Sequence, residues 1–188
     1  MGLKLNLGAG LNPQQGYLNV DKYGEPDFRC DLESFPWPWE DNSISEILLI
    51  HVLEHLGATT DTFIGIMKEM YRVCAHEAVI RIAVPHPRHD HFIGDPTHVR
   101  PVLPDMLMLF SKRANLHWQE TGGANSPLAL YHEVDFELIE ATFVLDEPYA
   151  SELKSGALAQ ADIDRLLKQR NNVASEIRIT LMAVKAGS

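Results

Sequence analysis

The sequence has 188 residues, a formal net charge of −10 at pH 7 and no run of three basic residues. This charge argues against broad binding to a nucleic-acid backbone, which needs clustered Lys and Arg. No apolar run approaches the about 20 residues of a membrane span, and the length fits one compact domain. The two cysteines, Cys30 and Cys74, indicate no disulfide framework, so a reducing cytoplasm is the expected location.

Four strands are predicted in the first fifty residues, where short apolar runs alternate with turn residues. The first of them ends in a glycine turn, and the fourth is the most apolar. The expected strands cover 3–7, 17–21, 27–30 and 44–50.

A helix is predicted over 60–73, because apolar residues recur there at helical spacing. Thr60 or Asp61 is expected to cap its start. A fifth strand is predicted over 77–84, and Pro85 ends it.

The segment 85–130 breaks this pattern, since it is rich in His, Pro, Asp and Gly. We expect it to form a lid-like insertion at the edge of the sheet where ligands bind. A short helix is predicted within it at 104–112, because Pro104 suits a first helical position.

The rest of the chain is expected to form a sixth strand over 134–145 and a seventh over 176–185, with helix between them at 150–170. Gly156 weakens that helix, and Asp162 is a candidate start for a separate one. Strands that alternate with helices imply an α/β domain with a mostly parallel sheet.

Polar motifs follow the expected strands, at the edge where open α/β sheets bind ligands. In chain order they are LNLGAG at 5–10, GYLNVD at 16–21, CDL at 30–32, PWPWEDNS at 36–43 and HVLEHL at 51–56. In this order the motifs resemble those of a small branch of the class I S-adenosylmethionine-dependent methyltransferases. The resemblance covers residues 3–84 well and the rest of the chain loosely.

The resemblance implies one Rossmann-like methyltransferase domain over residues 1–188, with a mostly parallel seven-stranded sheet. One departure from the family pattern lies at 11–16, which leaves room for about one turn of helix. We therefore expect a shortened first helix. The face of the sheet that it leaves thin would be covered by the C-terminal helix or by another subunit, so a homo-oligomer stays open.

The resemblance also implies the cofactor S-adenosyl-L-methionine and eight residues that contact it. A dinucleotide is disfavoured, because Pro13 stands where the dinucleotide fingerprint needs a third glycine. Asn6 replaces an acidic residue that is common in the family, so it cannot pair with the cofactor ammonium as a charge. The expected contacts are Asn6, Gly8, Ala9 and Gly10 to the amino acid part, Asp21 to the ribose hydroxyls, Asp31 and Leu32 to adenine, and His51 beside the sulfonium.

The sulfonium would repel a protonated His51, so we expect a neutral ring there. The expected lid carries further candidates for acceptor binding or for a general base, namely His86 and His98, while Arg100 is able to hold an anionic acceptor group. The alternative is that these side chains only hold the loop by hydrogen bonds. The histidine spacing matches no closed metal site, so no metal ligand is assigned.

The function implied by the resemblance is methyl transfer from S-adenosylmethionine to an O or N atom of a small molecule, a sugar or a protein. Nucleic acid and membrane are not expected partners. Two alternatives stay open. The first is an S-adenosylmethionine-binding protein without catalysis, and the second is a metal-dependent hydrolase that uses the histidine-rich segment 86–98.

Overall fold

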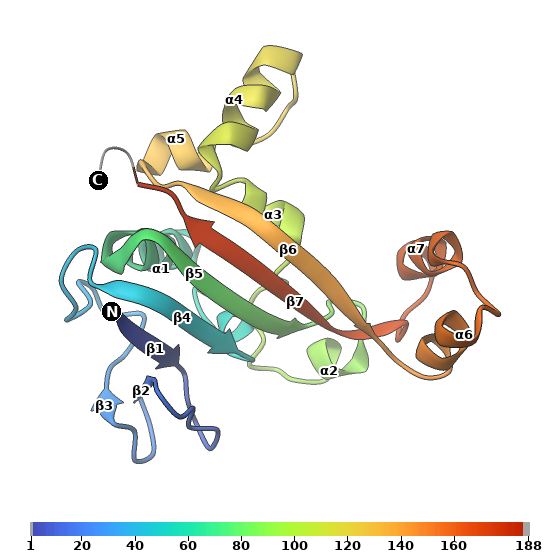
Figure 1. Ribbon diagram of the computed structural model, residues 1–188, viewed down its shortest axis with the longest axis horizontal. Helices are drawn as coiled ribbons and strands as arrows, with labels where there is room; N and C mark the ends of the chain where they lie inside the picture. Colours follow the sequence, from blue (N-terminus) through green and yellow to red (C-terminus); the bar gives the residue numbers. More distant parts are fainter. Residues whose placement is uncertain (1, 186–188) are drawn as a thin grey trace.

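The computed structural model describes residues 2–185 and contains the expected seven-stranded, mostly parallel sheet (Figure 1). The strand order is β3-β2-β1-β4-β5-β7-β6. The strands span β1 Leu3–Leu7, β2 Leu18–Asp21, β3 Phe28–Arg29, β4 Ile44–Ile50, β5 Cys74–Pro85, β6 Phe136–Leu145 and β7 Ala174–Ala183.

The first five strands pair in parallel, and β7 inserts antiparallel between β5 and β6. β1 pairs with β2 on one side and with β4 on the other, so the strand order reverses beside it. A crevice opens at such a reversal beyond the carboxyl ends of the strands. The sheet therefore brings the residues that follow β1, β2 and β4 to one place.

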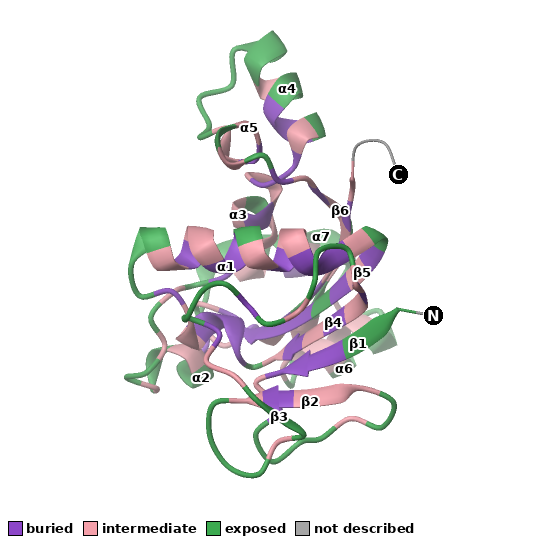
Figure 2. Ribbon diagram, turned by 90° about the vertical axis from the view of Figure 1, so that its left-hand side faces the viewer, coloured by how far each residue is buried: buried purple, intermediate pink, exposed green. Residues whose placement is uncertain are grey.

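The helix α1 (Thr60–Val73) has the predicted bounds and lies across one face of the sheet, with its buried side toward the strands (Figure 2). Its N-cap is Thr59, whose side chain accepts a hydrogen bond from the N–H of Thr62. The prediction of Thr60 or Asp61 as the cap was wrong, because the chain is already helical at Thr60. The residues that α1 buries are Phe63, Ile66, Met67, Met70 and Val73.

The connection from β1 to β2 contains turns and no helix in residues 8–17, all of which the structure describes. Even the expected single turn of helix is absent. The sheet face opposite α1 carries a charged network instead, in which Glu46 pairs with Lys4 at 2.8 Å and with Arg81 at 3.0 Å. Charged pairs across strands give that face a polar surface.

The segment after β5 forms four short helices: α2 Asp90–Ile93, α3 Pro104–Met108, α4 Lys112–Thr121 and α5 Leu128–His132. Pro104 begins α3 as predicted, but the helix ends four residues early. In Figure 1, α2 lies near the carboxyl ends of β4 and β5, whereas α4 and α5 lie near the opposite end of the sheet. A lid over the strand ends would thus be confined to the first part of the expected insertion.

The expected helix at 150–170 is two helices, α6 (Tyr149–Ser155) and α7 (Gln160–Gln169). Gly156 separates them in a left-handed conformation, and the Asp162 carboxylate accepts from the N–H of Ala159 at the start of α7. A 3₁₀ helix, η1 (Leu53–His55), follows β4 after His51 and Val52. Across residues 2–185, every helix falls short of the length and apolarity needed to cross a bilayer.

Candidate functional site

A cavity of about 460 Å³ lies at the carboxyl ends of β1, β2 and β4, and we call it the strand-end cavity. It contains five of the eight predicted cofactor contacts: Gly8, Asp21, Asp31, Leu32 and His51. Its full lining is Gly8, Asp21, Lys22, Tyr23, Cys30, Asp31, Leu32, Glu33, His51, Val52, His55, Leu56 and Thr97.

Gly8 shapes the floor of this cavity. Its φ of +70° favours glycine, and a Cβ there would stand 2.4 Å from the nearest side-chain carbon of Val52. The turn after β1 therefore packs directly against the residue that precedes η1. No other residue type fits at position 8 without moving one of these two segments.

The other members of the glycine turn do not line the cavity. Asn6 is buried, and its amide donates to Oδ1 of Asn19 at 2.9 Å and to the carbonyl of Asn12 at 3.1 Å. It thus ties β1 to β2 and to the turn. Ala9 is also buried, and the N–H of Gly10 donates to Asp21.

Asp21 is held in place by two backbone donors. Oδ2 accepts from Gly10 N at 2.8 Å, and Oδ1 accepts from Tyr23 N at 2.8 Å. Each carboxylate oxygen has a second lone pair, so the group can still accept from a ligand. The glycine turn and the end of β2 therefore orient this carboxylate at the edge of the cavity.

Asp31 and Leu32 lie on the same side of the cavity and are fixed by different partners. Oδ2 of Asp31 pairs with Lys22 at 2.6 Å, and this hydrogen bond lowers the pKa of the Asp31 carboxyl. The carbonyl of Leu32 accepts from Nε1 of the buried Trp37 at 3.1 Å. The loop that carries Trp37 therefore supports the cavity wall from behind.

His51 follows β4 with a φ of +55°, which places its ring between two carboxylates. Nε2 lies 2.8 Å from Oε2 of Glu176, and Nδ1 lies 3.6 Å from Oε1 of Glu54. Glu54 above all, and Glu176 as well, raise the pKa of His51 against the opposing effect of burial. Both carboxylates thus favour the protonated form of the ring, and the expectation of a neutral ring beside the sulfonium stays a prediction.

The three candidates in the expected lid lie outside the lining of the strand-end cavity. His86 is buried, and its Nδ1 accepts from the N–H of Arg88. Arg100 donates to the carbonyl of Gly57 at 2.7 Å and stacks on Phe63, 4.5 Å from the ring centre. Their assigned roles in acceptor binding and proton transfer stay predictions.

His98 does not line the cavity itself, but its ring packs against a residue that does. Its ring lies 4.6 Å from that of His55, measured between centres, and His55 lines the cavity. Glu54 joins these two histidines in the one group of three potential metal ligands found among residues 2–185. Sequence reasoning missed Glu54 as a site residue, although it stands inside the HVLEHL motif.

The other histidines of the rich segment take separate structural roles. His89 is buried and pairs with Asp146 at 2.7 Å, and the exposed His91 packs beside His89. The described histidines of 86–98 therefore do not gather into a metal centre of their own. This arrangement gives the hydrolase alternative no site within that segment.

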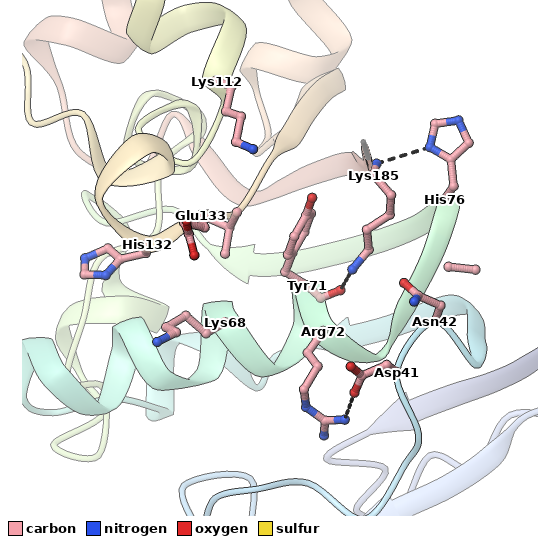
Figure 3. A pocket seen from close by; sticks show the side chains of 12 residues that line it. Asp41, Asn42, Lys68, Tyr71, Arg72, His76, Lys112, His132, Glu133 and Lys185 are labelled. Atoms are coloured by element: carbon pink, nitrogen blue, oxygen red, sulfur yellow. Dashed lines mark hydrogen bonds and ion pairs between the residues drawn. The ribbon is translucent and has the colours of Figure 1, made fainter. Parts of the chain in front are cut away.

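A larger cavity, of about 870 Å³, lies at the opposite end of the sheet (Figure 3). Figure 3 shows Lys185 beside Tyr71, near the end of α1. Arg72, the next residue of α1, pairs with Asp41 from the loop before β4. The cavity contains none of the predicted site residues. The larger of these two cavities is therefore not the one that the sequence motifs form. We place the candidate site in the strand-end cavity.

Neither a family model nor a curated protein matches the sequence. Among solved structures, the chain is similar to an S-adenosylmethionine-dependent methyltransferase from Archaeoglobus fulgidus, with 17% identity, a TM-score of 0.62 and coverage of 96% of this chain and 86% of that one. The YcgJ protein of Bacillus subtilis is 15% identical with a TM-score of 0.54, over 99% and 93% of the chains.

A third similar structure is the 1,6-didemethyltoxoflavin-N1-methyltransferase of Burkholderia thailandensis, solved with 1,6-didemethyltoxoflavin and S-adenosylhomocysteine. It is 11% identical with a TM-score of 0.53, over 97% of this chain and 71% of that one. At such identities the likeness establishes the fold. The protein has the Rossmann-like fold of the S-adenosylmethionine-dependent methyltransferases.

Proposed function

We propose that the protein is an S-adenosylmethionine-dependent methyltransferase whose acceptor presents an O or N atom. The observation that carries the proposal is the convergence of Gly8, Asp21, Asp31 and Leu32 on one cavity at the strand reversal. Three separate motifs supply these residues. Structures with this fold include methyltransferases solved with S-adenosylmethionine or S-adenosylhomocysteine.

The residues present suit the cofactor in the size of the cavity and in the hydrogen-bond acceptors that they offer. The cavity volume is within the range of small-molecule sites. Asp21 has lone pairs left to accept from two ribose hydroxyls, and Asp31 is able to accept from the exocyclic amine of adenine once it shares or releases Lys22. Gly8 leaves the backbone open to close approach.

When bound, S-adenosylmethionine supplies an electrophilic methyl group, and the protein supplies position and electrostatics. His51 and His55 face the cavity from the end of β4 and from η1. The buried position of His86 supports a structural role for it better than a role as a base. His98 and Arg100 remain the proposed acceptor-side residues, since both lie on the segment next to η1.

Calorimetry with S-adenosylhomocysteine tests the cofactor assignment. Asp21→Asn should weaken binding by about 10- to 100-fold, because a charge-assisted hydrogen bond contributes about 1.5–3 kcal/mol. Asp61→Asn changes an exposed carboxylate on α1 and should bind like the wild type. Unchanged affinity in Asp21→Asn would remove this residue from the site, and no binding by the wild type would overturn the proposal.

Methyl transfer to a panel of small-molecule, sugar and peptide acceptors separates the enzyme from a non-catalytic binding protein. The enzyme should convert S-adenosylmethionine to S-adenosylhomocysteine only when its acceptor is present. Tight cofactor binding with no turnover on any acceptor class would favour the binding protein.

A further inference from the structure

Glu54, His55 and His98 bring one potential ligand atom each to within 4.8 Å of one another. Glu54 and His55 belong to η1, and His98 comes from the segment after α2. The backbone fixes this meeting, because the carbonyl of Glu54 accepts from the N–H groups of Val99 and Arg100 at 2.9 and 3.2 Å. We call these three residues the Glu54 cluster.

The Glu54 carboxylate has no hydrogen-bond partner among residues 2–185, although only 1% of its surface is exposed. Both oxygens are buried, and the nearest charged group is Nδ1 of His51 at 3.6 Å. Burying an ionised carboxylate without full compensation is costly, so proteins pair such groups or use them to bind cations. His51 compensates this charge only in part, from 3.6 Å, and the imidazoles of His55 and His98 stand beside the same carboxylate, which supports the second use.

Hydrogen bonds already orient both imidazole rings. Nδ1 of His98 lies 2.9 Å from the carbonyl of Phe92, which can only accept, so this nitrogen carries the proton. The Thr97 hydroxyl donates to Asp95 at 2.6 Å, so its oxygen accepts from Nδ1 of His55 at 3.0 Å. When either ring binds as the neutral imidazole, its Nε2 lone pair is therefore the one left for a metal, and the Nδ1 partners match the outer contacts that metal-bound histidines make.

We propose that the Glu54 cluster binds one divalent transition-metal ion at the edge of the strand-end cavity. Two imidazoles and a carboxylate suit ions such as Zn²⁺, Mn²⁺ or Fe²⁺, and three protein ligands leave positions open for another molecule. The Asp95 carboxylate, 3.8 Å from Nε2 of His98, adds negative charge beside the site.

A metal held by the cluster would lie beside the cavity, because His55 and the neighbouring Thr97 belong to its lining. A metal here would bind an oxygen atom of the acceptor and so set its position next to the cofactor. This role rests on the proposed function, whereas metal binding itself does not. The acceptor class that it selects is one with an oxygen ligand, such as a hydroxyl or carboxylate group.

The test is metal binding by the full-length protein after treatment with a chelator, without cofactor. Titration with Zn²⁺ in a calorimeter should give one site per chain, and Co²⁺ should give visible absorption bands typical of bound imidazole and carboxylate. Glu54→Gln keeps the size of the side chain, and it should weaken Zn²⁺ binding by at least about 100-fold, since changes in outer contacts alone cost 10- to 100-fold. His98→Gln should do the same.

His91→Ala is the matched control, because His91 is exposed and belongs to the same histidine-rich segment. It should bind Zn²⁺ like the wild type. Absence of a stoichiometric site in the wild type, or equal loss in His91→Ala and His98→Gln, would overturn the proposal. Circular dichroism of each variant shows whether it is folded, and either cluster variant is sufficient for the test.

S-adenosylhomocysteine binding by the metal-free wild type separates this inference from the proposed function. Retained cofactor binding without any Zn²⁺ site would overturn only the proposed metal site and would leave the proposed function standing. A Zn²⁺ site without cofactor binding would overturn the methyltransferase and the acceptor role while the metal site stands.

Discussion

Gly8 meets two demands at once, a left-handed backbone and contact with Val52. Gly8→Ala should lower the free energy of unfolding by about 2–5 kcal/mol, because it adds backbone strain and overpacking. Gly16 has a φ of +86° with no atom near a would-be Cβ, so Gly16→Ala isolates the strain and should cost about 1–2 kcal/mol. Urea denaturation measures both. Equal costs would mean that Val52 yields to the added methyl group without loss.

The two cysteines offer a chemical probe of the strand-end cavity. Cys30 lines it, whereas Cys74 is fully buried, and burial raises the pKa of Cys74 to about 12. S-adenosylhomocysteine should therefore slow the alkylation of Cys30, and Cys74 should react only in the unfolded chain. Mass spectrometry of the labelled peptides follows each site separately. Equal labelling of Cys30 with and without the ligand would place the ligand elsewhere.

Among single residues, the sequence correctly indicated the cavity residues that stand at the ends of strands. Gly8 follows β1, Asp21 ends β2 and Asp31 lies just beyond β3, so their approach to one cavity follows from the topology. The meeting of Glu54 with His98 does not, because α1, β5 and α2 separate them along the chain and the contact depends on backbone hydrogen bonds between η1 and residues 99–100. No local pattern encodes such a contact.

The helix α1 shows how well one element can be predicted and where the prediction stops. Its apolar spacing gave the bounds, but the N-cap lies at Thr59. Thr59→Ala should lower the free energy of unfolding by about 1 kcal/mol, because the N–H of Thr62 loses its acceptor. Thr60→Ala, one residue further along, should change it by less than about 0.5 kcal/mol. Thermal or urea unfolding of both variants decides, and a larger cost at Thr60 would contradict the observed cap.

The short helices between β5 and β6 were largely beyond prediction, because tertiary contacts hold them. Asn115 in α4 donates to the carbonyl of Leu109 and accepts from the N–H of Ala129, so one buried side chain connects three pieces of chain. Helices of five residues are too short to be stable alone or to show a clear period. The long strands and α1 carry their own pattern and were predicted closely.

In the molecule as a whole, the two ends of the sheet carry different cavities with different sets of residues. The carboxyl ends collect glycine, carboxylate and imidazole groups around the strand-end cavity, and the amino ends open into the larger cavity of Figure 3. The face opposite α1 keeps its charged network where a first helix would lie. Five of the predicted cofactor contacts thus gather at one end of the sheet, and none of them lines the cavity at the other end.

Global stability should depend on pH through His86, which joins the end of β5 to β7. Burial chiefly, and the charges of Arg88 and His89 as well, lower the pKa of His86. The unfolded chain keeps the ordinary value of about 6.5. Below that value the unfolded state takes up a proton that the folded state does not, so this contribution to stability is present above about pH 6.5 and is lost as the pH falls through the folded pKa.

His86→Gln removes the titrating group and keeps an acceptor for the N–H of Arg88. The variant should be less stable than the wild type at about pH 8, because the packing of the ring is lost, and the deficit should shrink as the pH falls to about 5.5. His117→Gln, on the exposed side of α4, should leave the wild-type profile unchanged. Urea denaturation across this range measures the difference. A deficit that stays constant would show that His86 takes up its proton equally in the folded and unfolded chains, and a deficit that grows would mean that the folded protein favours the protonated ring.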